Sequence, residues 1–312
     1  MKVLVTGAGG FVGREVLRIL AQDPSLQVVA VDTGLRGLAA SPRLRLLAGN
    51  ITDESVREAA VGDGVDALVH LAAVPGGAAE MDPAASRRVN IDATLDLFDG
   101  VAREGRRPRV VFASTIAVFG DTLPPGGVDD STPLAPRLIY GAHKAMIETM
   151  LSTLHRRGAV SGVSLRLPGI IARPKGPSGM KSAFMSNLFH ALREGESFVS
   201  PVSPAATIWL MSVQQVALNL VHALRVDDAR IPAERALTLP ALRIGWSDLI
   251  AEVARQTGAP SSTVSFEPDA ALEEAFGAYP PLSTPAAERA GFAHDGDTAT
   301  LVARALEQIA RL

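Results

Sequence analysis

The beginning of the chain constrains its fold more than any other stretch. Residues 2–6 form a short apolar run, glycines follow at positions 7, 10 and 13, and a helical pattern begins at Phe11. A strand, a glycine turn and a helix in this order are typical of a dinucleotide site, because glycines let a diphosphate approach the main chain. The N-terminus of the helix then offers unpaired N–H groups and the positive end of its dipole to that diphosphate.

The spacing of the glycines narrows the kind of site. It reads Gly-x-x-Gly-x-x-Gly, with Val12 where the Gly-x-Gly-x-x-Gly pattern has its last glycine. A P-loop is excluded because Arg14 and Glu15 follow Gly13, in place of Lys and then Ser or Thr. The alternative is a glycine-rich turn that binds nothing, and the strand and helix on either side of the turn make it the weaker interpretation.

Composition limits the class of protein. The 312 residues are 47% hydrophobic, which is enough for one large or two small domains. A formal net charge of −3 without a basic run argues against a nucleic-acid partner. The chain has no cysteine, which excludes disulfides and thiolate metal sites and favours a cytoplasmic location. Its six histidines are scattered, so we expect no metal site.

One stretch without charged residues, 197–224, is long enough to span a membrane but does not have the continuous apolar composition of a membrane span. Pro201, Pro204 and several serines interrupt it. We therefore expect a buried strand and helix there, and no membrane partner.

Apolar, strand-like runs alternate with helical patterns through the first half of the chain. Strands are predicted at residues 2–6, 27–31, 44–48, 67–71, 110–113 and 163–167, and the longest helices at 83–104 and 137–157. Continuous apolar strands separated by helices predict an α/β fold with a doubly wound parallel sheet covered on both faces. We assign residues 1–167 to this domain, with 207–226 returning to it. Residues 168–206 and 227–312 are assigned to a small α/β C-terminal substrate domain.

Asp32 ends the second predicted strand. An acidic side chain there accepts hydrogen bonds from the adenosine ribose hydroxyls and repels a 2′-phosphate. The sequence therefore predicts NAD in preference to NADP, although Arg36 lies close by in the sequence. A surface aspartate at a strand end is the alternative.

Tyr140 and Lys144 lie four residues apart on a predicted helix, so their side chains share one face. An ammonium group near a phenol lowers its pKa from about 10 and suits it to act as a base. Ser114 and Thr115 follow directly from the fifth predicted strand. In a parallel sheet the C-terminal ends of the strands line the ligand crevice. The alternatives are a solvated Tyr/Lys pair and a simple strand-end cap.

Five motifs occur in one order over residues 1–225: the glycine turn, His70-Leu71-Ala72-Ala73, Asn90, Ser114-Thr115 with Val118-Phe119-Gly120, and Tyr140-x-x-x-Lys144. Together they resemble the extended short-chain dehydrogenase/reductase family, the sugar epimerase and dehydratase group. The resemblance implies a Rossmann-type NAD(P)-binding domain with Tyr140 as catalytic acid/base, Lys144 binding the nicotinamide ribose and Thr115 as the catalytic hydroxyl. It implies further cofactor contacts from Gly7, Gly10, Phe11, Val12, Asp32, Asn50, Ile51, Leu71, Ala72, Ala73, Asn90, Ser114 and Pro168.

Within this family, residues 165–178 resemble the D-erythronate dehydrogenases. Their loop Arg-Pro-Gly-Lys-Pro-Asn is matched by residues 173–178, with Gly and Lys exchanged and Ser178 replacing Asn, and Trp209 matches a later strand. Arginine suits two-point binding of a carboxylate, so Arg173 joins Thr115 and Tyr140 as a predicted substrate contact. A solvated loop arginine is the alternative.

Three functions are compatible with these patterns. The first is an NAD-dependent dehydrogenase of a small sugar acid, a D-erythronate-like aldonate or a uronate, with Tyr140 as base. The second is a nucleotide-sugar 4-epimerase or dehydratase that retains NAD, against which Thr207 counts, since such enzymes usually have an arginine near that place. The third is a redox sensor that binds NAD(P) without turnover.

The family resemblance also implies a homodimer through helices 83–104 and 137–157. Apolar residues on the second helix, such as Met146, support this prediction.

Overall fold

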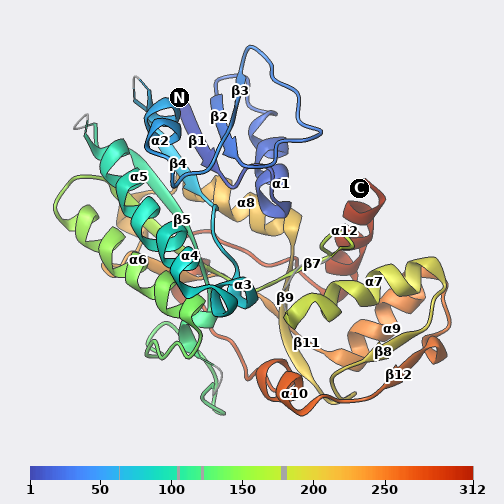
Figure 1. The fold of residues 1–312 in the computed structure, drawn as a ribbon. Helices are drawn as coiled ribbons and strands as arrows, with labels where there is room; N and C mark the ends of the chain where they lie inside the picture. Colours follow the sequence, from blue (N-terminus) through green and yellow to red (C-terminus); the bar gives the residue numbers. More distant parts are fainter. Residues whose placement is uncertain (63, 104–105, 121–122, 177–180, 312) are drawn as a thin grey trace.

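A seven-stranded parallel sheet forms the centre of the structure (Figure 1). The computed structural model describes residues 1–62, 64–103, 106–120, 123–176 and 181–311. The strand order is β10-β6-β5-β4-β1-β2-β3, and every neighbouring pair is parallel. The strands are β1 (Lys2–Thr6), β2 (Gln27–Asp32), β3 (Leu44–Ala48), β4 (Ala67–His70), β5 (Arg109–Thr115), β6 (Ser161–Leu167) and β10 (Ala236–Thr238). The order reverses between β1 and β4, so the predicted doubly wound, Rossmann-type fold is confirmed.

Helices cover both faces of this sheet, as its continuous apolar strands require. One face packs against α1 (Phe11–Leu20) and α8 (Val213–Ala223), whose buried residues share a core with β1, β5 and β6. The other face packs against α2 (Glu54–Val61), α5 (Ala93–Ala102) and α6 (Ile139–Arg156). Short helices also occur at α3 (Gly76–Met81), α4 (Pro83–Arg87) and α11 (Pro285–Arg289).

The helix predicted over residues 83–104 is interrupted. A π-helical turn, η1 (Arg88–Asp92), separates α4 from α5, and residue 104 lies outside the described residues. Two polar side chains in this region bond to the main chain and to other side chains. The Asn90 amide bonds both backbone groups of Val74, and the Thr94 hydroxyl donates to the Val89 carbonyl. Of these bonds, the one from Thr94 uses a backbone acceptor of the helix and so competes with regular helical pairing at the π-helical turn.

A second core lies beside the large sheet. It contains a three-stranded sheet of β7 (Gly169–Ile171), β9 (Thr207–Ser212) and β11 (Leu242–Gly245), and the pair β8 (Phe198–Ser200) and β12 (Val264–Phe266). Its helices are α7 (Phe184–Glu194), α9 (Trp246–Thr257), α10 (Ala270–Phe276) and α12 (Thr298–Ala310). Residues 236–238, which we assigned to the substrate domain, form β10 in the large sheet. The domain boundaries themselves stay a prediction.

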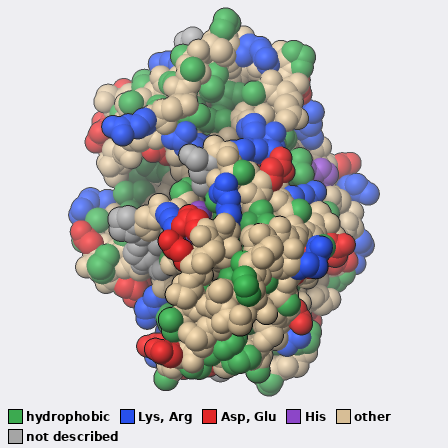
Figure 2. Space-filling model, turned by 90° about the vertical axis from the view of Figure 1, so that its right-hand side faces the viewer, with side chains coloured by type: hydrophobic (Ala, Val, Ile, Leu, Met, Phe, Trp, Pro, Cys, Tyr) green, Lys and Arg blue, Asp and Glu red, His purple; other side chains and the backbone are tan. Residues whose placement is uncertain are grey.

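The uncharged stretch 197–224 forms β8, β9 and α8. Within the described part of the chain, no helix is both long and apolar enough to cross a membrane. Single-turn helices complete the fold at η2 (Ile116–Phe119), η3 (Lys181–Ala183), η4 (Asp228–Arg230) and η5 (Ser261–Thr263). On the face drawn in Figure 2, acidic and basic side chains are interspersed, so their fields largely cancel there.

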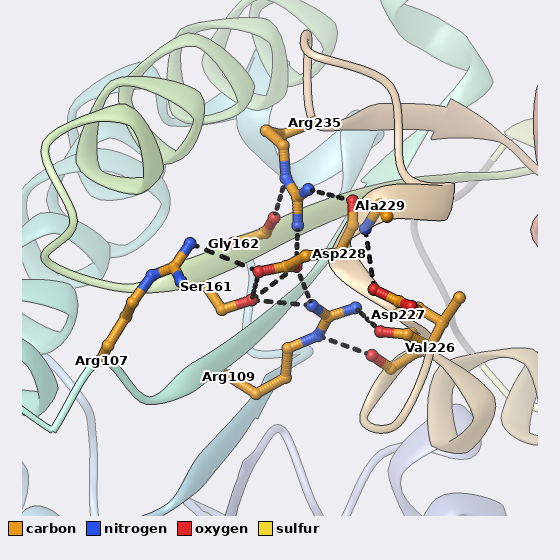
Figure 3. Close-up of polar contacts among 10 residues, drawn as sticks. Arg107, Arg109, Ser161, Gly162, Val226, Asp227, Asp228, Ala229 and Arg235 are labelled. Atoms are coloured by element: carbon orange, nitrogen blue, oxygen red, sulfur yellow. Dashed lines mark hydrogen bonds and ion pairs between the residues drawn. The ribbon is translucent and has the colours of Figure 1, made fainter.

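A cluster of arginines around Asp228 ties the starts of β5 and β6 to the segment before β10 (Figure 3). Arg109 and Arg235 donate to the Asp228 carboxylate at 2.6 Å each, Arg107 at 3.3 Å, and Ser161 at 2.8 Å. Burial acts to raise the pKa of Asp228, but the bonds from Ser161 and Arg235 and the charges of Arg235 and Arg109 lower it to about 2. One carboxylate thus links the first residues of β5 and β6 to the residue that precedes β10.

Candidate active site

The glycine turn has a backbone that only glycine allows. Gly7 has φ +69°, and a Cβ on it would lie 2.7 Å from the amide nitrogen of Ala72. A Cβ on Gly13 would lie 2.1 Å from the Gly7 carbonyl oxygen. Gly10 caps α1, and no side chain bonds the first turn of that helix. The N–H groups at Phe11 and Val12 therefore remain available to an anion, which fits the diphosphate of a dinucleotide.

Asp32 ends β2 directly beside this turn. Its carboxylate accepts hydrogen bonds from Gly9 N at 3.0 Å and from Gly34 N at 2.8 Å, and the side chain remains half-exposed. Its remaining acceptor sites suit ribose hydroxyls. Asn50, after β3, bonds Thr52 N with its side chain, and Ile51 is buried behind it. These placements agree with the predicted adenosine contacts, which stay a prediction.

The loop after β4 is held against the turn by Asn90. Residues 71–73 lie partly buried beside Gly7. The Asn90 side chain is 3% exposed, accepts from Val74 N at 2.8 Å and donates to Val74 O at 2.9 Å. The structure therefore uses the Asn90 amide to shape this loop, and the cofactor contact of Asn90 stays a prediction. Pro168, another predicted contact, is buried between β6 and β7.

His70 is fully buried behind the crevice and both of its ring nitrogens have partners. One ring nitrogen contacts the Thr6 hydroxyl at 2.7 Å and the other contacts the Thr94 hydroxyl at 3.0 Å. Complete burial, together with the charge of Lys144, lowers the pKa of His70 to about 3. The ring is therefore neutral and connects β1, β4 and α5. Among the described residues, no group of acidic or histidine side chains is arranged to hold a metal ion.

Tyr140 and Lys144 meet at the C-terminal end of β5. The Lys144 ammonium is buried, donates to the Ala113 carbonyl at 2.7 Å, and lies 5.6 Å from the centre of the Tyr140 ring. Thr115 stands at the same strand end, half-buried, and accepts a bond from Ala117 N through its hydroxyl oxygen. The fold thus brings the predicted catalytic residues to the carboxyl edge of the sheet, where ligands of such sheets bind.

Burial opposes charge on both residues of this pair. It raises the pKa of Tyr140 to about 12, and the Arg173 guanidinium lowers it in part. It also lowers the pKa of Lys144 to about 7, against the charge of Glu148. From sequence we expected Lys144 to supply the charge that favours the Tyr140 phenolate. In the structure the cation that opposes the effect of burial on Tyr140 is Arg173.

Arg173 lies in this site because its backbone is fixed by α7. Its N–H donates to the Ser186 hydroxyl at 3.0 Å, and its carbonyl contacts the His190 ring at 2.7 Å. The guanidinium lies 5.6 Å from the centre of the Phe11 ring, at the start of α1. It pairs with no carboxylate among the described residues. The nearby Lys175 pairs with Glu194, and residues 177 and 178 of the predicted loop lie outside the described residues.

Two residues that we did not single out from sequence support this site. The Ser114 hydroxyl points away from the crevice and donates to Glu148 at 2.5 Å, while Arg166 holds the same carboxylate at 2.8 Å. Glu148 and Arg166 are 4% and 11% exposed. The signal for Glu148 was its position one turn after Lys144 on the same helix face. No comparable signal marked Arg166, whose partner is far away in the sequence.

Over residues 3–228 the chain matches the model of the NAD dependent epimerase/dehydratase family. The chain belongs to this family. It is an NAD-dependent enzyme of the extended short-chain dehydrogenase/reductase type, and NAD is its cofactor. The predicted family, enzyme class and cofactor are therefore confirmed.

This member of the epimerase/dehydratase family has relatives along most of its length. It is 34% identical over 291 residues to the D-erythronate dehydrogenase of Cupriavidus necator, covering 90% of each chain. It is 29% identical to the D-erythronate dehydrogenase of Haemophilus influenzae, again over 90% of each. A solved structure, the nucleoside-diphosphate-sugar epimerase from Agrobacterium tumefaciens, superposes with a TM-score of 0.88 at 29% identity, over 97% of this chain and 92% of that one.

Proposed function

We propose that this protein oxidises a hydroxyl group of a small sugar acid, a D-erythronate-like aldonate or a uronate. The observation that carries the proposal is the position of Arg173. Its guanidinium is half-buried, lacks a carboxylate partner among the described residues, and acts electrostatically on Tyr140. A half-buried cation that lacks a carboxylate partner among the described residues and lies beside a base favours an anionic substrate. The similarity to two D-erythronate dehydrogenases supports the same substrate class.

Each residue then has one task. The first turn of α1 would hold the diphosphate of NAD and Asp32 its ribose, and NAD would supply the acceptor for the hydride that leaves the carbinol carbon. Tyr140, as phenolate, accepts the proton of the substrate hydroxyl, and the Thr115 hydroxyl orients that oxygen. Arg173 holds the carboxylate at two points and so fixes which hydroxyl faces Tyr140. Lys144, when protonated, adds to the charge that favours the phenolate.

Substitution of Arg173 tests this assignment. Losing a charge-assisted bond to a bound anion costs about 1.5–3 kcal/mol, so Arg173→Ala should lower kcat/KM for the acid roughly 10- to 150-fold. Arg173→Lys should recover only part of this loss, because an ammonium cannot make the planar two-point contact. Arg193→Ala, at an exposed position on α7, is the matched control and should behave as wild type. Unchanged kinetics in Arg173→Ala would remove the basis of the proposal.

A nucleotide-sugar 4-epimerase remains the second candidate for two reasons. One is the similarity to the Agrobacterium tumefaciens epimerase. The other is Arg243 on β11, which we did not consider from sequence. It lies 3.4 Å from the Thr207 hydroxyl and donates to the Tyr279 carbonyl. It thus places a guanidinium next to the position where epimerases usually have an arginine.

A substrate screen separates the two candidates. Aldonates, uronates and nucleotide sugars are each incubated with enzyme and NAD, and the absorbance of NADH is followed. We expect net NADH formation with an aldonate or uronate only. Epimerisation of a nucleotide sugar without net NADH, and without oxidation of any acid, would establish the second candidate in its place. The non-catalytic sensor considered from sequence is disfavoured by the assembled Tyr140 and Lys144 pair.

A further inference from the structure

A cavity outside the predicted active site lies at the β6–β10 edge of the large sheet. It has a volume of about 670 Å³ and is enclosed by α6, by the β6–β10 edge of the sheet, by η4 and by α11. Pockets for small molecules have volumes of about 300–1,000 Å³. None of the residues that line it belongs to the predicted cofactor or substrate contacts. The cavity is therefore separate from the active site, although α6 contributes to both.

The charges around this cavity favour an anion. Two of its three carboxylates are already engaged: Glu148 by Arg166, and Asp130 by the N–H of Ala286. An amide N–H does not neutralise Asp130, so Asp130 and Glu234 together face three further arginines, Arg156, Arg230 and Arg289, which leaves one positive charge in excess. Arg156 bonds only hydroxyl groups, and within the described part of the chain neither Arg230 nor Arg289 forms an ion pair. Apolar side chains, such as Leu134 and Ile231, complete the lining.

The sheet face below the cavity is polar. Arg166 and Ala236 line the cavity, and residues two apart on a strand point to the same face. Ser164 precedes Arg166 by two residues, and Thr238 follows Ala236 by two, so both hydroxyls lie on this face. Each is at most 2% exposed, and neither has a hydrogen-bond partner among the described residues. Unsatisfied buried hydroxyls are rare and call for an explanation. Their position distinguishes this face from the apolar core on the other side of the sheet.

The wall of the cavity is connected to the catalytic residues. Arg166 holds Glu148 by three hydrogen bonds, and Glu148 accepts from the hydroxyl of Ser114, the neighbour of Thr115. Glu148 also acts electrostatically on Lys144. An anion drawn to Arg166 would compete with Glu148 for the guanidinium and add negative charge behind Lys144. Both effects favour the ammonium form of Lys144, which binds the nicotinamide ribose in the resembling family.

We propose that this cavity binds a small organic anion, a carboxylate or phosphate on a short carbon chain, and that the Arg166–Glu148 pair transmits its occupancy to Lys144 and the cofactor. Binding should tighten the affinity for NADH, and by linkage NADH should tighten the affinity for the anion by the same factor. The proposal does not depend on the identity of the oxidised substrate, because NADH binding is measured without it.

Calorimetry on the protein saturated with NADH tests the site, since the cofactor then fills the anion-binding turn of α1. Citrate and inorganic phosphate are the probes. We expect one of them to bind with a Kd of about 1 mM or tighter, and the double variant Arg230→Glu/Arg289→Glu to weaken it at least tenfold. Arg193→Glu, on α7, is the matched charge control and should leave binding unchanged. Ala229→Trp, at an exposed rim position, should block the cavity without changing its charge.

Four results would overturn the proposal, two for the site and two for the transmission. The site is refuted if neither probe binds at this strength, or if the double variant and Ala229→Trp bind as wild type does. The transmission is refuted if a probe binds but leaves the Kd for NADH, measured by NADH fluorescence, unchanged. If a probe still shifts the Kd for NADH in the double variant, the effect comes from another site, and the transmission is refuted as well. Thermal melts of each variant confirm that the fold is retained.

Discussion

The charge states of Tyr140 and Lys144 are set by burial more than by their spacing. Four residues of helix bring both side chains to one face, but the pKa of Tyr140 is raised to about 12 and that of Lys144 lowered to about 7. Each shift favours the neutral form of its group. The charge needed for proton abstraction therefore depends on a neighbouring cation, and Arg173 is the one that the structure provides.

Removal of the phenol oxygen tests the role of Tyr140. Tyr140→Phe keeps the ring and its packing and removes only the hydroxyl. Loss of a positioned acid/base group costs about 10²-fold or more in kcat, so turnover should fall by that factor while NADH affinity stays nearly constant. Stopped-flow turnover and NADH fluorescence titration measure the two quantities. A variant that turns over at the wild-type rate would show that another group is the base.

The buried lysine predicts a pH dependence of stability. Its pKa is about 7 in the folded protein and 10.5 as a free group. Between these values the unfolded chain binds a proton that the folded chain does not, so the lysine contributes stability that rises with pH. Lys144→Met lacks this contribution. Urea denaturation without cofactor should therefore show wild type gaining stability relative to Lys144→Met from pH 7 to pH 10. A constant difference between the two would contradict the low pKa.

At the scale of elements, Asp228 connects three strands through one carboxylate. Arg109 and Arg235 are 10% and 3% exposed and share it, and Arg235 adopts φ +59°, a left-handed conformation that is costly for a residue with a side chain. The short edge strand β10 follows immediately. The Asp228 carboxylate thus compensates the buried positive charges of Arg109 and Arg235, beside the place where β10 pairs with β6.

Asp228→Asn should be strongly destabilising, because it leaves two buried guanidinium groups without a countercharge. Since Asp228 itself is 34% exposed, we expect a loss of about 2–3 kcal/mol in the free energy of unfolding, below the range for fully buried pairs. The control is Glu252→Gln, which removes the partner of the exposed Arg255 and should cost less than about 1 kcal/mol. Urea denaturation compares them. If both variants lose the same free energy of unfolding, the Asp228 cluster contributes no more to stability than an exposed ion pair does.

At the scale of the whole molecule, the outer face of α6 predicts a homodimer. Of the apolar residues on this helix, Ile147 and Leu151 are buried in the monomer, whereas Met146 and Met150 are 57% and 40% exposed. Met81, the last residue of α3, is 78% exposed. Apolar side chains gathered on neighbouring helices are typical of an interface.

Charge on this face should dissociate the dimer. Met146→Glu/Met150→Glu places two carboxylates in the expected interface, and desolvating them opposes association. Light scattering should give the mass of a dimer for wild type and of a monomer for the double variant. Leu218→Glu, at a position 44% exposed on α8, is the control and should stay dimeric. A monomer mass for wild type at micromolar concentration would refute the interface.

Much of this protein could be predicted from sequence because the relevant physics is local. Only glycine fits the positive φ of Gly7 and the close approach at Gly13, so the turn is visible in the spacing alone. Apolar runs located the strands of the parallel sheet, and helical periodicity brought Tyr140 and Lys144 to one face. These features depend on residues close together in the chain.

Other features were decided by the tertiary structure, because they depend on residues far apart in the chain and on burial. The three-residue strand β10 joins the large sheet only through pairing with β6. The Ser114 hydroxyl and the Asn90 amide turn inward to Glu148 and Val74, which no local pattern indicates. Arg173 lies beside Phe11 because α7 fixes its backbone. Which groups carry charge in the site follows from desolvation and from neighbours that only the fold supplies.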